Sequence, residues 1–417
     1  MSTELNSIKR VAMVGLGYIG LPTAALMASR GLEVIGVDVN QSTVDTINAG
    51  NVHIVEPDLD IVVRSTVTTG NLRATTVMEK ADAFLVAVPT PFKDDHVPDL
   101  KYIESAASMI APVLEKGNLV ILESTSPVGT TEKLAAWLAD ARPDLTFPLQ
   151  AGENADIQVA HCPERVLPGY VLQELVSNDR IIGGMGQKSI DKATELYKRF
   201  VKGECIPTNA RTAEMAKLTE NAFRDTNIAF ANELSLLCDR LDIDVWELIS
   251  LANRHPRVNI LQPGPGVGGH CIAVDPWFIV DSAPDLARMV RTAREVNDSK
   301  PHEVVKAVEE KAAKFKSPTI ACFGAAFKAN IDDLRESPAL QIISDLTEKN
   351  LGRILVVEPN ISALPSTLSG EVELSSVEAA LAEADIVVGL VDHDSFKQIS
   401  AKQMSSKIVL DYRGMWR

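Results

Sequence analysis

A single cysteine stands next to the most glycine-rich stretch of the chain. Cys271 follows four glycines within QPGPGVGGHCIAVDPW, residues 262–277. So many glycines disfavour a helix, and backbone without side chains lets a bulky polar ligand approach the thiol. His270 and nearby backbone dipoles would favour the thiolate, which is the reactive form of cysteine. The spacing is compatible with a covalent nucleophile or with an inert thiol, because free cysteines are among the most buried residues.

Two further clusters of polar side chains could act beside such a thiol. Glu214, Lys217 and Asn221 are spaced at i, i+3 and i+7, so they share one face of a predicted helix. Apolar neighbours indicate a partly shielded lysine, although a single lysine on a helix is usually solvated. In CPERVLPG, Glu164 and Arg165 lie between two prolines, which predicts either a fixed functional loop or a surface ion pair.

A third pattern predicts a nucleotide cofactor. Gly15, Gly17 and Gly20 form G-x-G-x-x-G between a strand-like and a helix-like segment, where absent side chains allow a tight turn and close approach to a pyrophosphate. Asp38 ends the next strand-like segment, where a carboxylate can bind a ribose 2′-hydroxyl and repel a 2′-phosphate. NAD is therefore favoured over NADP. Thr90, in a VPTP turn, offers a hydroxyl at a sheet edge or belongs to an ordinary proline-rich loop.

The apolar pattern predicts the elements that position these residues. Apolar strands alternate with helical segments from residue 11 onward and again after residue 300, which predicts two Rossmann-like, doubly wound α/β domains. Between them, apolar residues recur at helical spacing over a stretch too long for a routine surface helix. The predicted parts are residues 1–205, a central long-helix region at 206–297, and residues 298–417. We expect the central helix to pair with a copy of itself in a homodimer.

Composition excludes several classes of function. The formal net charge of −15 argues against a nucleic-acid-binding surface, because such surfaces neutralise phosphates with lysine and arginine. The five cysteines are scattered and lack the spacing of a zinc site or of a secreted disulfide framework, so no metal and a reducing cytoplasm are expected. No uninterrupted apolar run approaches the roughly 18 residues that span a bilayer, so no membrane partner is expected.

Eight motifs make the chain resemble one enzyme family. GLGYIGLPTA, VAVPTP, ESTSPVGTTE, CPERVLPG, EMAKLTENAFRD, NRHPRVN, GPGVGGHCIAVDP and FGAAFKANIDDLRESPA occur in the order found in the UDP-sugar 6-dehydrogenases of the UDP-glucose/GDP-mannose dehydrogenase family. The resemblance spans nearly the whole chain. It looks closest to the bacterial members that oxidise UDP-N-acetyl-D-mannosamine, given HIVEPDL and VPTPFKDDHVPD. It implies an NAD-binding first domain, a central dimerisation and active-site region, and a UDP-sugar-binding last domain.

The resemblance also implies a mechanism. It is a four-electron oxidation of a sugar alcohol to a carboxylate with two NAD, through a cysteine thiohemiacetal and a thioester. Cys271 matches the nucleophile, and Lys217 the acid/base or oxyanion-stabilising group. Glu164 matches a carboxylate that assists thioester formation or hydrolysis, Thr125 a hydroxyl that helps place the attacking water, and Asp275 an acid close to the lysine and that water.

Two sets of binding residues follow from the same resemblance. The implied substrate contacts are Arg165, Val166, Lys217, Asn221, Arg224, His255, Arg257, Gly268, Phe327 and Lys328. The implied cofactor contacts are Gly15, Gly17, Tyr18, Ile19, Gly20, Asp38, Thr90, Thr131, Arg335 and Arg413. Two positions depart from the family pattern. Val274 stands where glucose-oxidising relatives commonly have lysine, and Arg413 where the N-acetylmannosamine enzymes often have lysine.

The sequence leaves alternatives open. UDP-N-acetylglucosamine is the second candidate substrate, because it differs from UDP-N-acetylmannosamine only in configuration at C2. UDP-glucose is the third. A non-catalytic sensor of NAD or of a nucleotide sugar is the alternative from another class. Retention of Cys271, Lys217, Glu164 and Asp275 together argues against it. The implied setting is cytoplasmic synthesis of an aminouronic acid for a bacterial surface polysaccharide.

Overall fold

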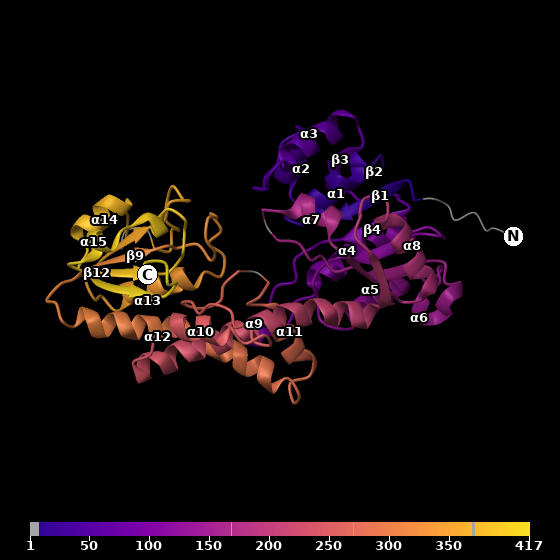
Figure 1. Ribbon diagram of the computed structural model, residues 1–417. Helices are drawn as coiled ribbons and strands as arrows, with labels where there is room; N and C mark the ends of the chain where they lie inside the picture. The colour runs from indigo at the N-terminus through magenta and orange to yellow at the C-terminus, as the bar shows by residue number, and fades with distance from the viewer. Residues whose placement is uncertain (1–7, 168, 270, 369–371) are drawn as a thin grey trace. The chain divides into compact units, whose positions relative to one another are not determined.

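The computed structural model describes residues 8–167, 169–269, 271–368 and 372–417. The chain forms two compact units, Met1–Thr219 and Glu220–Arg417 (Figure 1). Each unit contains a sheet of mostly or wholly parallel strands together with helices, which confirms the predicted α/β class. The boundaries predicted near residues 205 and 297 stay predictions.

The first unit is built on an eight-stranded sheet. Its strand order is β3-β2-β1-β4-β5-β6-β7-β8, and only the β6–β7 pair is antiparallel. The order reverses direction between β1 and β4, which is the switch point where doubly wound sheets bind ligands at the carboxyl ends of their strands. The strands are β1 (Arg10–Val14), β2 (Glu33–Val37), β3 (Leu72–Thr75), β4 (Ala83–Val86), β5 (Leu119–Leu122), β6 (Gln158–His161), β7 (Arg180–Gly184) and β8 (Cys205–Asn209).

Helices and short turns connect these strands. The helices are α1 (Gly20–Ser29), α2 (Gln41–Asn48), α3 (Leu59–Thr68), α4 (Lys101–Ile110), α5 (Thr130–Ala141), α6 (Pro148–Ala151), α7 (Val171–Ser177) and α8 (Gln187–Tyr197). The 3-10 turns are η1 (Asp94–His96), η2 (Ala111–Val113) and η3 (Gly152–Asn154).

In β1, Val11 and Met13 join one hydrophobic core while Ala12 and Val14 join the other, because successive side chains of a strand point to opposite faces. The sheet is therefore covered on both sides.

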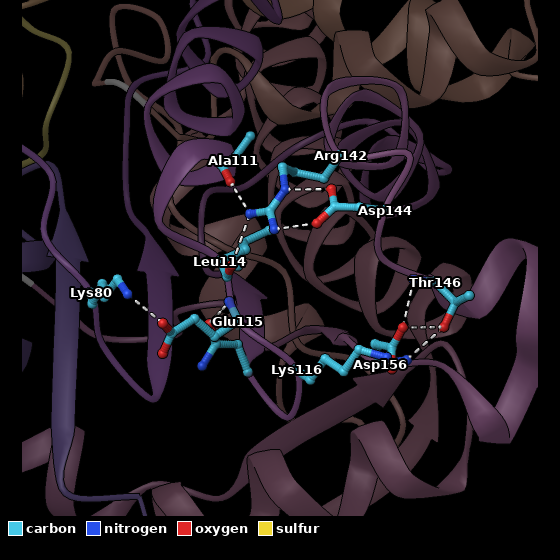
Figure 2. Close-up of polar contacts among 10 residues, drawn as sticks. Lys80, Ala111, Leu114, Glu115, Lys116, Arg142, Asp144, Thr146 and Asp156 are labelled. Atoms are coloured by element: carbon cyan, nitrogen blue, oxygen red, sulfur yellow. Dashed lines mark hydrogen bonds and ion pairs between the residues drawn. The ribbon is translucent and has the colours of Figure 1, made fainter.

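Polar contacts fasten the loops at the amino ends of β4, β5 and β6. Arg142 donates to the carbonyl oxygens of Ala111 and Leu114, each at 2.8 Å, and forms a two-pronged ion pair with Asp144 (Figure 2). A guanidinium fork suits such planar, paired acceptors. These contacts stabilise the edge of the sheet opposite the carboxyl ends of the strands.

A long helix continues from the first unit into the second. It is α9 (Ala210–Leu241), which has 32 residues and confirms the predicted central long-helix region. The second unit adds α10 (Val245–Ala252), α11 (Asp275–Ser282) and α12 (Arg288–Ala312). Within the second unit, the buried Arg294 of α12 pairs with the buried Asp225 of α9 at 2.6 Å, so these helices are tied by a charge pair as well as by apolar packing.

A second, smaller sheet ends the chain. Its strands are all parallel in the order β11-β10-β9-β12-β13. They are β9 (Thr319–Phe323), β10 (Arg353–Val357), β11 (Glu373–Leu374), β12 (Ile386–Gly389) and β13 (Ile408–Asp411), connected by α13 (Pro338–Glu348), α14 (Val377–Glu383), η4 (Phe396–Gln398) and α15 (Ala401–Met404). Buried cores lie on both of its faces. None of the helices in the described ranges combines the length and hydropathy that crossing a bilayer requires.

Candidate active site

The glycine motif forms the turn between β1 and α1. Gly15 has φ +89°, and a side chain there would come within 2.5 Å of the Ala87 carbonyl oxygen. A Cβ on Gly20 would lie 1.8 Å from the Gly15 carbonyl oxygen, so this glycine lets the helix start close to the strand. Nothing lies within 4 Å of a Cβ built on Gly17, which therefore faces open space. Turn, close packing and open approach are the three tasks of a dinucleotide-binding glycine motif.

Asp38 lies beside this turn, immediately after β2. Its Oδ2 accepts a hydrogen bond from the Leu16 N–H at 3.0 Å, and its Oδ1 accepts one from the Asn40 N–H at 2.9 Å. The half-buried carboxylate is held where a ribose hydroxyl of a bound dinucleotide is expected. Tyr18 is exposed and Ile19 half-buried in the same turn. The residues of the first unit therefore fit NAD.

Two threonines of the predicted site meet at the carboxyl edge of the same sheet. Thr90 follows β4 and Thr125 follows β5, which pairs with β4. The Thr90 hydroxyl donates to the Thr125 carbonyl oxygen at 2.6 Å. Thr90 is buried and Thr125 is half-buried, so this bond joins the two loops.

Thr131 lies in the first turn of α5 and is fully buried. Its hydroxyl and its N–H both donate to Glu214 Oε1, at 2.6 and 2.8 Å, and the Gly129 N–H donates to Glu214 Oε2 at 2.6 Å. Glu214 of α9 thus caps the start of α5, where a helix favours negative charge. Burial raises the pKa of Glu214, and these three donors oppose that effect. Cofactor contact by Thr131 stays a prediction.

Glu164 lies in the loop after β6, next to the loop that carries Thr125. The strands β5 and β6 are parallel, and Leu122 pairs with His161, so both loops leave the sheet at its carboxyl edge. Glu164 is 7% exposed, and its Oε2 accepts from the Val166 N–H at 2.9 Å. This places a carboxylate in a fixed and largely dehydrated position. Its neighbours Arg165 and Val166 are half-buried.

Lys217 is half-buried on α9, and Glu214, one turn earlier, is buried. The three hydrogen bonds to Glu214 fix this part of α9 against α5. The sequence identified Glu214 as one member of a polar helix face. It held no sign of the capping role, since the donors lie more than 80 residues away in the chain.

In the second unit, the glycine-rich segment packs against a loop of the second sheet. A Cβ on Gly269, where φ is +84°, would lie 2.8 Å from the Phe327 ring, and one on Gly268 would lie 2.4 Å from the Glu336 carbonyl oxygen. Glycine is therefore required for close approach. Cys271 follows this contact and is exposed. His270, expected to favour the thiolate, lies outside the described residues.

Asp275 begins α11 four residues after Cys271. It is 2% exposed, and the buried Asn221 side chain donates to its Oδ2 at 2.5 Å. The Cys271 carbonyl oxygen accepts from the Asp275 N–H at 2.9 Å, so the thiol-bearing residue starts the turn that leads into the helix. The structure thus brings Asn221, Asp275 and the Cys271 backbone together.

The other predicted binding residues of the second unit differ in exposure. The exposed members are Arg224, His255, Arg257, Lys328 and Arg335, and the half-buried ones are Phe327 and Arg413. Arg335 pairs with Asp333 at 2.6 Å, and Arg413 pairs with Asp392 at 2.8 Å. Their cofactor contacts stay predictions.

Sequence reasoning missed a buried group of charged residues behind Glu164. Arg180 is 2% exposed, and Glu123 and Tyr197 are buried nearby in the first unit. The available signal was an arginine at the start of the apolar segment RIIGG, because a charged side chain in a buried strand is rare unless it is paired.

Three domains of one known family match most of the chain. Residues 9–201 match the NAD binding domain of the UDP-glucose/GDP-mannose dehydrogenase family, residues 211–299 its central domain, and residues 321–417 its UDP binding domain. These assignments agree with the dinucleotide turn in the first unit.

Individual relatives extend over the full length. The chain is 66% identical over 408 residues to an NDP-N-acetyl-D-galactosaminuronic acid dehydrogenase of Ralstonia nicotianae, covering 98% of this chain and 96% of the relative. It is 61% identical over 419 residues to the UDP-N-acetyl-D-mannosamine dehydrogenase of Escherichia coli K12, covering 99% and 100%. A solved UDP-D-ManNAc dehydrogenase from Pyrococcus horikoshii superposes with a TM-score of 0.88 at 38% identity, covering 98% and 96%. The chain therefore belongs to the UDP-glucose/GDP-mannose dehydrogenase family and is an NAD-dependent dehydrogenase.

Proposed function

We propose that the protein oxidises UDP-N-acetyl-D-mannosamine to UDP-N-acetyl-D-mannosaminuronate, with Cys271 as a covalent nucleophile. The observation that carries this proposal is the exposed thiol at the end of a loop whose glycines pack too closely against Phe327 to accept side chains. A thiol in that position is reachable by a bulky polar substrate. The match to the family's UDP binding domain supports a UDP-sugar as that substrate.

The reaction consists of two oxidations joined by covalent capture. The primary alcohol carbon first loses a hydride, and its hydroxyl loses a proton, to give an aldehyde. The Cys271 sulfur bonds to the aldehyde carbon while the carbonyl oxygen takes up a proton, which gives a thiohemiacetal. Loss of a second hydride and a proton gives a thioester, and water cleaves its carbon–sulfur bond to release carboxylate and thiol. NAD, held by the turn at Gly15 and by Asp38, would supply the hydride acceptor for each oxidation, so two NADH per sugar are expected.

Each proposed catalytic residue has a task that suits its surroundings. Lys217, on the anchored turn of α9, holds the proton of the reacting oxygen or stabilises its negative charge. Glu164, buried and fixed by the Val166 N–H, takes a proton from the attacking water. Thr125 helps to place that water. Asp275 is an acid beside the turn that begins at Cys271.

Cationic side chains suit the charges of the substrate. Arg165, Arg224, Arg257 and Lys328 offer guanidinium and ammonium groups for a diphosphate or a newly formed carboxylate. His255 accepts from the Arg257 N–H through Nδ1 at 3.3 Å, so these two residues share one exposed turn. Val166, Asn221, Gly268 and Phe327 complete the proposed substrate contacts.

We propose a homodimer through α9. Phe223, Phe230 and Leu237 are spaced by seven residues and are 68%, 51% and 45% exposed. A repeat of seven places these side chains along one stripe of the helix. An exposed stripe of large apolar residues is typical of a surface that pairs with another chain.

The proposed setting is cytoplasmic synthesis of an aminouronic acid for a bacterial surface polysaccharide of the enterobacterial common antigen type. Within the described residues none of the five cysteines forms a disulfide, which suits a reducing compartment. Relatives from Escherichia coli and Salmonella typhi carry the mannosamine name, which supports the choice of product.

A second sugar has a specific observation in its favour. A relative at 66% identity is named for an N-acetyl-D-galactosaminuronic acid, so a galactosamine-type substrate competes with the mannosamine one. UDP-N-acetylglucosamine remains the further alternative. The test measures NADH and carboxylate formation from the UDP derivatives of the three N-acetylhexosamines and from UDP-glucose. Highest kcat/KM with the mannosamine sugar supports the proposal, and highest kcat/KM with another sugar replaces it. Binding of NAD and sugar with no NADH from any of them would identify a sensor.

A further inference from the structure

A buried arginine lies directly behind the proposed catalytic carboxylate Glu164. Arg180 is the first residue of β7, and its Nη1 lies 3.8 Å from Glu164 Oε1. The two side chains are 2% and 8% exposed. Among the described residues, Glu164 Oε1 has no hydrogen-bond partner, and neither do Nε and Nη2 of Arg180. The pairing of the two charges therefore compensates in part for their burial.

Burial makes this pairing important for the position of Glu164. A buried carboxylate loses hydration, and a nearby positive charge offsets part of that loss. Removing one partner of a buried ion pair leaves the other uncompensated, which is strongly unfavourable. Arg180 therefore places a positive charge 3.8 Å from Glu164 Oε1, the carboxylate oxygen to which the Val166 N–H does not donate.

A second carboxylate faces the same arginine. Glu123 follows β5 and is fully buried, and its Oε1 accepts from the Tyr197 hydroxyl at 2.5 Å. Burial raises the pKa of Glu123 to about 7, while the Tyr197 hydroxyl and the Arg180 charge oppose the rise. The Tyr197 ring centre lies 5.8 Å from Arg180 Cζ, and burial raises the pKa of the nearby Cys162 thiol to about 12. Below about pH 7 Glu123 is therefore protonated and carries no negative charge that would compete for Arg180.

We propose that Arg180 is a positioning residue that holds the Glu164 carboxylate fixed for attack of water on the thioester. Arg180 acts through Glu164 and contacts no reacting atom in this account. The inference rests on the proposed role of Glu164. Apolar residues that replace both members of a buried ion pair are often equally stable, so burial alone does not explain why the pair is charged.

The test compares Arg180→Met, Arg180→Lys and Glu164→Gln in the full-length enzyme. We measure kcat and KM with UDP-N-acetylmannosamine, the thermal midpoint, and the fraction of Cys271 carrying a covalent sugar during turnover by intact-protein mass. Arg142→Met is the matched control, because Arg142 is a structural arginine at the opposite edge of the same sheet.

Glu164→Gln and Arg180→Met should both lower kcat on the order of tenfold or more, as loss of a general base does. Both should leave the sugar KM within about threefold of the unmodified value and raise the covalent fraction. Arg180→Lys, which keeps the charge but not the fork, should lie between Arg180→Met and the unmodified enzyme. A fall in kcat with little change in KM, partly rescued by Arg180→Lys, is a pattern that a purely structural residue does not produce. Arg142→Met should leave kcat unchanged.

Three results would overturn the inference in distinguishable ways. If Glu164→Gln is impaired while folded Arg180→Met keeps the unmodified kcat, Arg180 has no positioning role and the proposed function stands. If Arg180→Met does not fold, an unmodified kcat in Arg180→Lys likewise excludes the positioning role. If Glu164→Gln itself keeps full kcat with no covalent fraction, the proposed role of Glu164 fails and the inference fails with it.

Discussion

The side-chain amide of Asn221 donates to Asp275 Oδ2 at 2.5 Å, with both residues buried. Asn221 belongs to α9 and Asp275 begins α11, so one hydrogen bond joins the central helix to the turn that starts at Cys271. A hydrogen bond to a buried carboxylate is stronger than one between neutral groups. This contact therefore fixes the turn that begins at Cys271 relative to α9.

Replacing Asn221 tests that role. Asn221→Ala removes the amide donor from a buried carboxylate, which should destabilise the protein by about 1–3 kcal/mol. Because Asn221 is also a proposed substrate contact, kcat/KM should fall as well. Urea unfolding and steady-state kinetics measure the two effects. Glu233→Ala, an exposed change on the same helix, serves as the control. Equal stability of Asn221→Ala and the unmodified chain would contradict the prediction.

The glycine turn predicts opposite behaviour for two similar substitutions. A side chain on Gly17 meets open space within the protein, so Gly17→Ala should fold normally and raise the KM for NAD by blocking approach of the pyrophosphate. A side chain on Gly20 collides with the Gly15 carbonyl oxygen, so Gly20→Ala should lower the thermal midpoint. Calorimetry and NAD titration distinguish the two. A Gly17→Ala enzyme with unaltered KM for NAD would place the cofactor elsewhere.

The buried Glu123 predicts a pH-dependent stability. Its pKa is raised to about 7 in the folded protein from an ordinary 4.5, so the folded state holds the proton more tightly than the unfolded chain. The stability from this group is complete below about pH 4.5 and is lost as the pH rises through about 7. Glu123→Gln should therefore be more stable than the unmodified chain by up to about 3 kcal/mol at pH 8.5, and nearly equal to it at pH 5.

Urea unfolding at both pH values checks this, with the exposed Glu115→Gln as the control. A difference that does not change with pH would show that Glu123 does not titrate in this range.

The exposed stripe on α9 predicts how the protein assembles. Phe230→Glu places a charge in the middle of the stripe and should shift the protein from dimer to monomer in light scattering. Val77→Glu makes the same kind of change at a residue that is 65% exposed in the first unit, and it should leave the mass unaltered. A stable, active monomer of the unmodified chain at low concentration would contradict the proposed dimer.

Local patterns predicted both sheets and the long helix because strand and helix periodicity is written in neighbouring residues. The turn at Gly15 and the acid at Asp38 were predictable for the same reason, since their spacing follows from one βαβ unit. The antiparallel β7 was not predictable, because RIIGG is apolar on both faces and carries no sign of strand direction.

Contacts between distant segments explain the features of the site that the sequence did not predict. Glu214 caps α5 from more than 80 residues away, and Arg180 meets Glu164 from a different strand. A short stretch of sequence reveals neither contact, because a buried charge is explained only by the distant residues that the fold places beside it. The requirement for glycine at Gly269 is of the same kind, since it depends on the ring of Phe327.

The most direct test of the account is carboxylate formation by Cys271→Ser. The unmodified enzyme and a Cys205→Ser control should each form two NADH per molecule of UDP-N-acetylmannosamine. The Cys271→Ser variant should bind NAD and sugar yet release no uronate, because it cannot form the thioester. Undiminished uronate from folded Cys271→Ser would contradict covalent catalysis by this residue.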